Sequence, residues 1–179
     1  LKVRRHRPSA RRLAGAAARV AILDVNEEAG TAAAAELGGI FIATDVTQPD
    51  AVADALDSAR AAYGTERICV ACAGIAPAAK TVSRGNAHDA ALFARVIGIN
   101  LVGSFNLASQ SAAAMTANAP EGSDGERGVI IHTASVAAYD GQIGQTAYAA
   151  SKGGVAGMVL PMARDLADKA VRVMAIAPG

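Results

Sequence analysis

Short apolar runs alternate with longer alanine-rich runs along this chain, and that alternation constrains the fold more than any other feature. The short runs carry β-branched residues and predict strands at 19–24, 40–43, 68–72, 129–131 and 171–177. The longer runs predict helices that end at Gly15 and Leu37 or cover 49–62, 92–117 and 147–167. Strands joined by helices pair in parallel through right-handed crossovers. We therefore expect an α/β fold, a doubly wound parallel sheet in a single domain.

Composition excludes several other classes of protein. Of the 179 residues, 52% are apolar and 18% are charged, which is typical of a folded domain with a sizeable core. Six of the 17 basic residues lie in the first 12 positions, so the rest of the chain is acidic, which argues against nucleic acid as a partner. No apolar run has the length expected of a membrane span, and no signal-peptide pattern is visible. We therefore expect no membrane association and a cytoplasmic location.

Cys69 and Cys72 form a C-x-x-C motif, a spacing that can indicate redox chemistry or metal binding. Both fall within the predicted strand 68–72, where residues three apart project to opposite faces. The two thiols are therefore not expected to pair or to share a metal ion. We interpret both as small buried apolar groups.

The stretch 129–157 carries the residues with the most evident chemistry. Ser135 follows a predicted strand, and Tyr148 and Lys152 lie four positions apart on the next helix, so they share one face. Bringing the pKa of a phenol from about 10 to about 7 requires roughly 4 kcal/mol. A lysine ammonium about 4 Å away supplies about that much at an effective dielectric near 20. The three side chains predict proton transfer at an alcohol oxygen, with a cofactor as the hydride carrier.

In its motifs, the chain resembles the short-chain dehydrogenase/reductase family. The matching residues are Ser135, Tyr148, Lys152, Asn100, the strand-end sequence Cys72-Ala73-Gly74 and the final Pro178-Gly179. The resemblance implies an oxidoreductase that transfers a hydride between NAD and a secondary alcohol or ketone. It also implies a small-molecule substrate bound at the site.

The resemblance assigns a role to each catalytic residue. Tyr148 acts as the acid–base group, Lys152 favours the ionised phenol and binds the nicotinamide ribose, and Ser135 orients the reacting oxygen. Asn100 holds a water beside the lysine and so completes a proton relay. An asparagine inside a helix is mildly unfavourable, so its presence invites an explanation. A plain buried, hydrogen-bonding asparagine is the alternative.

Besides Tyr148 and Lys152, six residues are candidates for binding the cofactor. Asp24 ends the strand 19–24, where a doubly wound fold uses an acid to bind the ribose hydroxyls of NAD and to repel the 2′-phosphate of NADP. Its alternative role is to cap the following helix. By resemblance, Asp45 and Val46 hold the adenine ring, although Asp45 could be an ordinary turn acid. The segment Cys72, Ala73 and Gly74 packs beside the cofactor ribose, where a side chain at Gly74 would occupy space.

Both ends of the chain depart from the family pattern. A glycine-rich turn, T-G-x-x-x-G-x-G, is expected near the start to receive the pyrophosphate, but residues 1–9 form a basic head without it. We therefore divide the chain into this head and a truncated dinucleotide-binding domain, 10–179. The first strand of the sheet is expected to be missing and to leave a slot in the middle of the sheet. The family's substrate region, which follows Pro178-Gly179, is missing as well.

Within the family, the chain resembles the type 2 3-hydroxyacyl-CoA dehydrogenases, on the loop 118–128, the stretch TASVAAYDGQIGQTAYAASKGGVAGM and the ending RVMAIAPG. That resemblance implies 3-hydroxyacyl-CoA and 3-oxoacyl-CoA as substrates, and a homodimer or homotetramer formed through helices 92–117 and 147–167. The alternatives are a 3-oxoacyl-carrier-protein reductase that prefers NADPH and a catalytically dead member that acts only in oligomerisation.

Of the remaining polar residues, we expect His132 to be a satisfied core group and His88 a solvated helix start. Gln142 and Gln145 could line the substrate site.

Overall fold

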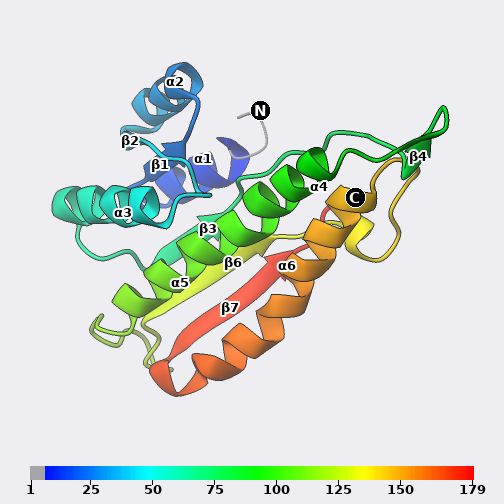
Figure 1. Ribbon diagram of the computed structural model, residues 1–179. Coiled ribbons are helices and arrows are strands. Elements are labelled where there is room, and N and C mark those ends of the chain that lie inside the picture. The colour runs from blue at the N-terminus through cyan, green and yellow to red at the C-terminus, as the bar shows by residue number, and fades with distance from the viewer. Residues whose placement is uncertain (1–6) are drawn as a thin grey trace.

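The structure, a computed structural model, describes residues 7–179, in which helices pack around a parallel sheet that is split in two (Figure 1). The strands of the sheet are β1 (Ala21–Asp24), β2 (Ile40–Ala43), β3 (Ile68–Ala71), β6 (Gly128–Thr133) and β7 (Val171–Ile176). The helices are α1 (Arg7–Gly15), α2 (Glu27–Leu37), α3 (Pro49–Tyr63), α4 (Ala90–Ile97), α5 (Gly103–Met115) and α6 (Thr146–Asp165). All the strands and helices expected from the sequence are present, and the expected α/β class is confirmed.

The strands form two separate parallel groups. In one, β1 pairs with β2, with Ala21 opposite Ile40. In the other, β6 lies between β3 and β7. In a doubly wound sheet the strands, numbered along the chain, lie side by side in the order 3-2-1-4-5-6. Strands β2, β1, β3, β6 and β7 correspond to strands 3, 2, 4, 5 and 6 of that order, which leaves the place of strand 1 between β1 and β3. Within residues 7–179, no strand lies between β1 and β3, as expected from the sequence, and these two strands do not pair.

Helices α3, α5 and α6 contact the strands from one side, and α2 packs on β1 and β2. Figure 1 shows α5 and α6 crossing in front of the β3-β6-β7 group. The largest cluster of buried apolar residues lies beneath them and contains Cys69, Ala108, Ala112, Met115, Ile130 and Val171. Close packing requires a glycine at position 128, because a Cβ there would lie 2.6 Å from the sulfur of Met115. This core fixes α5 and α6 relative to the carboxyl end of β6.

Local sequence explains where the first helices begin and end. The Asn26 side chain accepts a hydrogen bond from the Ala29 N–H and so caps α2, and Gly38 ends that helix with a positive φ of 63°. Pro49 stands in the first turn of α3, where its missing N–H costs nothing. Helix α1 begins at Arg7, three residues before the domain boundary that the sequence suggested at Ala10. The described part of the head is therefore continuous with the domain.

One expected helix is interrupted. The run 92–117 is built as α4, a π-helical turn at Gly98–Val102, and α5. Within Ala90–Met115, an 18-residue stretch has a mean hydropathy of 1.5, so this run is long and apolar enough to cross a membrane by those criteria, and the expectation that no run has this length is wrong. The same run packs against β3 and β6 and buries hydrogen-bonded Asn100, Ser104 and Asn106. These contacts hold one face of the run against the sheet, while only 22% of its most apolar stretch is buried.

A short hairpin, β4 (Val82–Ser83) with β5 (Asn86–Ala87), was not expected from the sequence. Two-residue strands are too short to give a periodic pattern. The hairpin leaves the sheet near the loop before α6, where the Ala79 N–H donates to the Gly144 carbonyl at 2.9 Å. It therefore borders the end of the sheet that carries the candidate site.

Candidate active site

The parallel arrangement places the carboxyl ends of neighbouring strands at a common edge, and most candidate residues follow those ends. Asp24 ends β1, Cys72 follows β3 directly, and Ser135 comes two residues after β6. In doubly wound folds, ligands bind at this edge. The structure thus gathers, at one edge, residues that are as far as 111 positions apart in the sequence.

Lys152 is fixed at the carboxyl end of β6. Its side chain is only 4% exposed, and its ammonium donates a hydrogen bond to the Thr133 carbonyl. The same ammonium lies 5.8 Å from the centroid of the Tyr148 ring, one helical turn earlier on α6. The expected convergence of the phenol and the ammonium on one face of a helix is therefore present. A buried cation needs such partners because desolvation is costly.

Ser135 lies on the strand-to-helix connection beside α6. Its hydroxyl accepts a hydrogen bond from the Ala137 N–H at 3.2 Å and so caps the short 3₁₀ turn Val136–Ala138. That turn packs directly on α6, where a Cβ added at Gly153 would lie 3.8 Å from the Ala138 carbonyl oxygen. The serine is thereby held on a rigid turn at the same end of β6 as Lys152.

Asn100 lies in the π-helical turn and is fully buried. Its side-chain oxygen accepts from the Ile75 N–H at 2.8 Å, and its amide nitrogen donates to the Ile75 carbonyl and the Ser151 hydroxyl at 2.9 Å each. Both N–H groups of the amide are therefore used. A relay water would have to bind an oxygen of this residue, so the role as a water-holding group stays a prediction. π-Helical turns are frequent at functional sites.

Two residues that complete this network were missed by the sequence analysis. Thr133 binds the Lys152 ammonium through its carbonyl, while its hydroxyl donates to the Cys72 sulfur at 3.3 Å. Ser151 is fully buried and connects Asn100 to the Tyr148 carbonyl, to which its hydroxyl donates at 2.7 Å. Neither contact has a sequence signal of its own, because each joins segments that only the fold brings together.

The cofactor candidates occupy different environments. Asp24 accepts a hydrogen bond from the Asn26 N–H at 2.9 Å, but Asn26 itself caps α2, so the alternative of Asp24 as the helix cap is wrong. Asp45 accepts from the N–H and the hydroxyl of Thr47 at 2.9 and 2.8 Å, as a turn acid does. Its role at the adenine ring stays a prediction.

Val46 and Gly74 follow the carboxyl ends of β2 and β3, respectively. The Val46 side chain is 7% exposed and packs in a small core with Val52 and Leu56, so its first role is structural. At Gly74, an added Cβ would lie 3.2 Å from the Asn100 side-chain oxygen and 3.9 Å from the Lys152 ammonium. The backbone at Gly74 therefore stays bare beside Lys152, as expected for a close approach to a ligand.

Burial keeps both cysteines protonated. It raises the pKa of Cys69 to about 12, and it raises that of Cys72 as well, against the opposing effects of the Thr133 hydroxyl and the Lys152 charge. Both cysteines are free thiols, and no cluster of metal-binding side chains occurs within residues 7–179. A neutral thiol is a poor nucleophile and a poor metal ligand. The interpretation as a buried apolar group thus holds for Cys69, whereas Cys72 follows the end of β3 and is only half-buried.

The two histidines differ from their expected environments. His132 is fully buried, as expected, but neither ring nitrogen has a hydrogen-bond partner among the described residues, so it is not a satisfied group. His88 is half-buried, packs edge-on against Phe93 at 6.1 Å, and precedes Asp89, which caps α4. The expectation of a solvated helix start is therefore wrong.

In the loop before α6, the Gln145 side chain accepts from the Gln142 N–H at 3.0 Å, so these two residues stabilise their own turn.

Buried His132 predicts acid sensitivity of the fold. Desolvation, and secondarily the Lys152 charge, lowers the pKa of His132 below the usual value of about 6.5. The unfolded chain protonates this imidazole more readily than the folded chain does. The stability that comes with the buried neutral ring is therefore complete above about pH 6.5 and is lost as the pH falls. The free energy of unfolding then changes by at most about 1.4 kcal/mol per pH unit. Urea unfolding between pH 5 and 8 checks this: His132→Phe should remove part of the acid-side loss, and an unchanged pH dependence in that variant would contradict it.

The fold and this edge of the sheet define a class of dehydrogenases. The model of the family described as short chain dehydrogenase matches residues 7–179, and the chain belongs to this family. It is thus an oxidoreductase by family, with a doubly wound fold that suits a nicotinamide cofactor.

More specific likenesses come from individual proteins. The chain is 47% identical over 175 residues to the human 3-hydroxyacyl-CoA dehydrogenase type-2, covering 96% of this chain and 67% of that protein. It is 48% identical to the Drosophila melanogaster protein of the same name, covering 97% and 69%. The crystal structure of 3-hydroxyacyl-CoA dehydrogenase type-2 from Mycobacterium avium superimposes with a TM-score of 0.89 at 41% identity, covering 97% and 70%. An NAD⁺-bound xylitol dehydrogenase gives 0.85 at 31%, covering 97% and 65%. The chain thus spans about two thirds of these relatives.

Proposed function

We propose that this chain uses NAD to interconvert a 3-hydroxyacyl-CoA and a 3-oxoacyl-CoA. The observation that carries the proposal is the position of the Lys152 ammonium, buried at the end of β6 and 5.8 Å from the Tyr148 ring. The substrate class comes from the relatives named 3-hydroxyacyl-CoA dehydrogenase type-2. NAD, when bound, accepts or supplies the hydride.

The residues at the sheet edge fit such a cofactor. Asp24 uses one carboxylate oxygen for the Asn26 N–H, and its negative charge at the end of β1 favours ribose hydroxyls over a 2′-phosphate. The bare backbone at Gly74 and the Lys152 ammonium lie together at the end of β3, where the nicotinamide ribose would be held.

Tyr148 is the proposed acid–base group. It takes a proton from the alcohol oxygen or returns one to the carbonyl oxygen, and the Lys152 ammonium lies 5.8 Å from the centroid of its ring. Ser135 orients the same oxygen from its turn beside α6. Asn100 keeps the β3 and α6 sides of the site together, because it binds Ile75 on one and Ser151 on the other.

Two other functions are the alternatives to this proposal. A 3-oxoacyl-carrier-protein reductase would prefer NADPH, against which the acid at Asp24 argues. A catalytically dead member would retain the fold and fail to bind the dinucleotide, an outcome that the split sheet makes worth testing.

Titrating NADH and NADPH into the purified chain, followed by fluorescence and melting temperature, tests the proposal. We expect NADH to bind more tightly, and Asp24→Asn, which keeps an oxygen for the Asn26 N–H, to shift the preference toward NADPH by about tenfold, because one charge repulsion of about 1.4 kcal/mol is removed. Asp54→Asn, an exposed acid on α3, is the control and should change nothing. If the chain does not bind NADH at millimolar concentration, the proposed dehydrogenase activity is rejected in favour of a catalytically dead family member.

The proposal includes a homo-oligomer formed through α5 and α6. Val102 at the end of the π-helical turn and Phe105 on α5 are 45% and 50% exposed, and Leu160 on α6 is 56% exposed, so apolar side chains face outward along both runs. We expect Phe105→Glu to lower the oligomeric state measured by sedimentation, because it places a charge in an apolar contact. Val82→Glu, which alters an exposed apolar residue of the hairpin, should leave that state unchanged. An unchanged mass for the Phe105 variant would reject this interface.

A further inference from the structure

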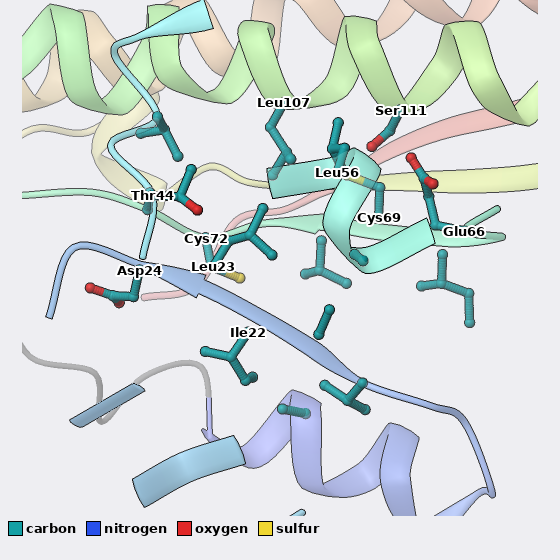
Figure 2. A pocket seen from close by; sticks show the side chains of 18 of the residues that line it. Ile22, Leu23, Asp24, Thr44, Leu56, Glu66, Cys69, Cys72, Leu107 and Ser111 are labelled. Atoms are coloured by element: carbon teal, nitrogen blue, oxygen red, sulfur yellow. The ribbon is translucent and has the colours of Figure 1, made fainter. Parts of the chain in front are cut away.

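The connection between β2 and α3, residues 44–48, lies beside the carboxyl end of β1. The Thr44 N–H donates a hydrogen bond to the Asp24 carbonyl at 3.0 Å, which joins the start of the connection to that strand end. Asp24, Thr44 and Asp45 border one cavity together with Leu107 of α5, and Figure 2 shows Asp24, Thr44 and Leu107 around it. The connection therefore belongs to the edge of the sheet where the proposed cofactor binds.

One face of α5 holds this connection in place. Gly103, Asn106 and Gln110 are three and four positions apart, so they lie on the same side of the helix. A Cβ added at Gly103 would lie 2.5 Å from Cγ2 of Val46, so the glycine allows α5 to approach closely. The Asn106 amide donates to the Val46 carbonyl at 2.9 Å. The Gln110 amide donates to the Pro49 carbonyl, also at 2.9 Å.

The Asn106 contact differs from the Gln110 contact in the peptide group that it binds. The Val46 carbonyl and the Thr47 N–H belong to one planar peptide group. That N–H donates to Oδ1 of Asp45 at 2.9 Å, and the Thr47 hydroxyl donates to the same oxygen at 2.8 Å. A single peptide plane therefore connects the Asn106 amide, which is buried, to the Asp45 carboxylate, which is exposed.

The orientation of this carboxylate decides what it can bind. Within residues 7–179, the hydrogen bonds to Asp45 all go to Oδ1, which leaves Oδ2 for a ligand. A carboxylate accepts hydrogen bonds and does not donate them, so it suits an amino group such as that of adenine. Guanine presents a carbonyl oxygen where adenine presents its amino group, and two acceptors repel each other. A fixed Asp45 carboxylate thus favours adenine over guanine.

We propose that Asn106 is a positioning residue for an adenine nucleotide. Through the Val46–Thr47 peptide, it orients the Asp45 carboxylate toward the adenine amino group. Asn106 itself does not line the cavity, so it acts from behind the site. Because the carboxylate is held before the ligand arrives, less conformational freedom is lost on binding. The inference rests on the proposed function, since it takes the adenine half of NAD as the ligand.

The experiment compares Asn106→Leu with the unmodified full chain in binding adenosine monophosphate (AMP), followed by NMR titration. Leucine keeps the size and branching of asparagine but removes the donor to the Val46 carbonyl. We expect the AMP dissociation constant to rise by about tenfold, because the carboxylate loses its support. Reduced nicotinamide mononucleotide, which lacks the adenine, should bind as it does to the unmodified chain.

Gln110→Leu is the matched control. It removes an amide contact from the same face of α5, but the Pro49 carbonyl that it releases is not part of the peptide that holds Asp45. This variant should change the AMP dissociation constant by less than twofold. Amide hydrogen exchange of Thr47 in the free chain should become faster in Asn106→Leu and stay unchanged in Gln110→Leu. If the leucine variant at position 106 does not fold, Asn106→Ala gives the same comparison.

A double-mutant cycle separates positioning from a purely structural role. If Asn106 acts through Asp45, Asn106→Leu should weaken AMP binding by less than twofold in a chain that already carries Asp45→Ala. A structural contact would instead lower the affinity by the same factor in both chains. The preference for AMP over guanosine monophosphate should also fall by about tenfold in Asn106→Leu. Melting temperatures of the variants check that they remain folded.

Three results overturn the inference: an AMP affinity of Asn106→Leu equal to that of the unmodified chain, equal effects in both backgrounds of the cycle, or an equal loss of nicotinamide mononucleotide binding. Failure of the proposed function gives a different result. A chain that binds AMP with these effects but does not turn over acyl-CoA substrates keeps the role of Asn106 and rejects the dehydrogenase activity. A chain that binds neither AMP nor NADH in the millimolar range rejects both.

Discussion

Replacing Tyr148 with phenylalanine is expected to lower the turnover number for reduction of a short 3-oxoacyl-CoA by about a thousandfold. A positioned acid–base group contributes typically about 10²–10⁴ to the rate, and phenylalanine keeps the ring while it removes the proton that the reaction needs. The ring beside the Lys152 ammonium remains in place, so binding of NADH should change little. Steady-state kinetics that follow NADH absorbance, with a separate NADH titration, measure both quantities.

Tyr139 provides the matched control for this substitution. It lies in the same connection between β6 and α6, is 81% exposed, and is not part of the hydrogen-bond network around Lys152. Tyr139→Phe should therefore retain the rate of the unmodified chain. A Tyr148→Phe variant with a rate within tenfold of the unmodified chain would remove the phenol from the mechanism.

Replacing Lys152 with methionine is expected to lower the same turnover number by about 10²–10³, the range observed when one preorganised electrostatic group is lost from an active site. Methionine retains an unbranched apolar side chain but removes the positive charge beside the phenol and leaves the Thr133 carbonyl without its hydrogen-bond donor. In contrast to the tyrosine variant, NADH binding should weaken too, because the proposed contact with the ribose is lost.

A second lysine on the surface separates charge removal from loss of the site. Lys169 lies beyond α6 and pairs with Asp168 at 2.6 Å in an exposed position, where such pairs contribute little. Lys169→Met should preserve the turnover number and NADH binding. Circular dichroism and urea unfolding of both variants check that they remain folded. If Lys152→Met binds NADH and turns over like the Lys169 variant, the role assigned to the buried ammonium is wrong.

Much of the fold could be predicted because buried parallel strands leave continuous apolar runs in the sequence. The strand at 40–43 is observed at Ile40–Ala43, and the strand at 68–72 ends one residue early, at Ala71. The hairpin β4–β5 and the π-helical turn could not be predicted in this way. Two-residue strands have no period, and the change from i+4 to i+5 hydrogen bonds in the backbone leaves no mark on the pattern of apolar residues.

The candidate site could likewise be predicted from the sequence only in part. Spacing predicted that Tyr148 and Lys152 share a helix face, since a helix repeats every 3.6 residues whatever surrounds it. The partners of Lys152 and Asn100 could not be predicted, because Thr133 and Ile75 approach them from other elements. The unpaired ring of His132 could not be predicted either, since a sequence does not show which polar atoms will lack a partner after packing.

The sequence by itself determined the class of fold, the order of strands and helices, and the residue types available for proton transfer, because these depend on local periodicity and on side-chain chemistry. Only the tertiary structure decided which backbone groups hold Lys152 and Asn100, and how burial raises or lowers the pKa of Cys69 and His132. The physical reason is that hydrogen bonding and desolvation depend on neighbours in space, which the order of residues along the chain does not specify.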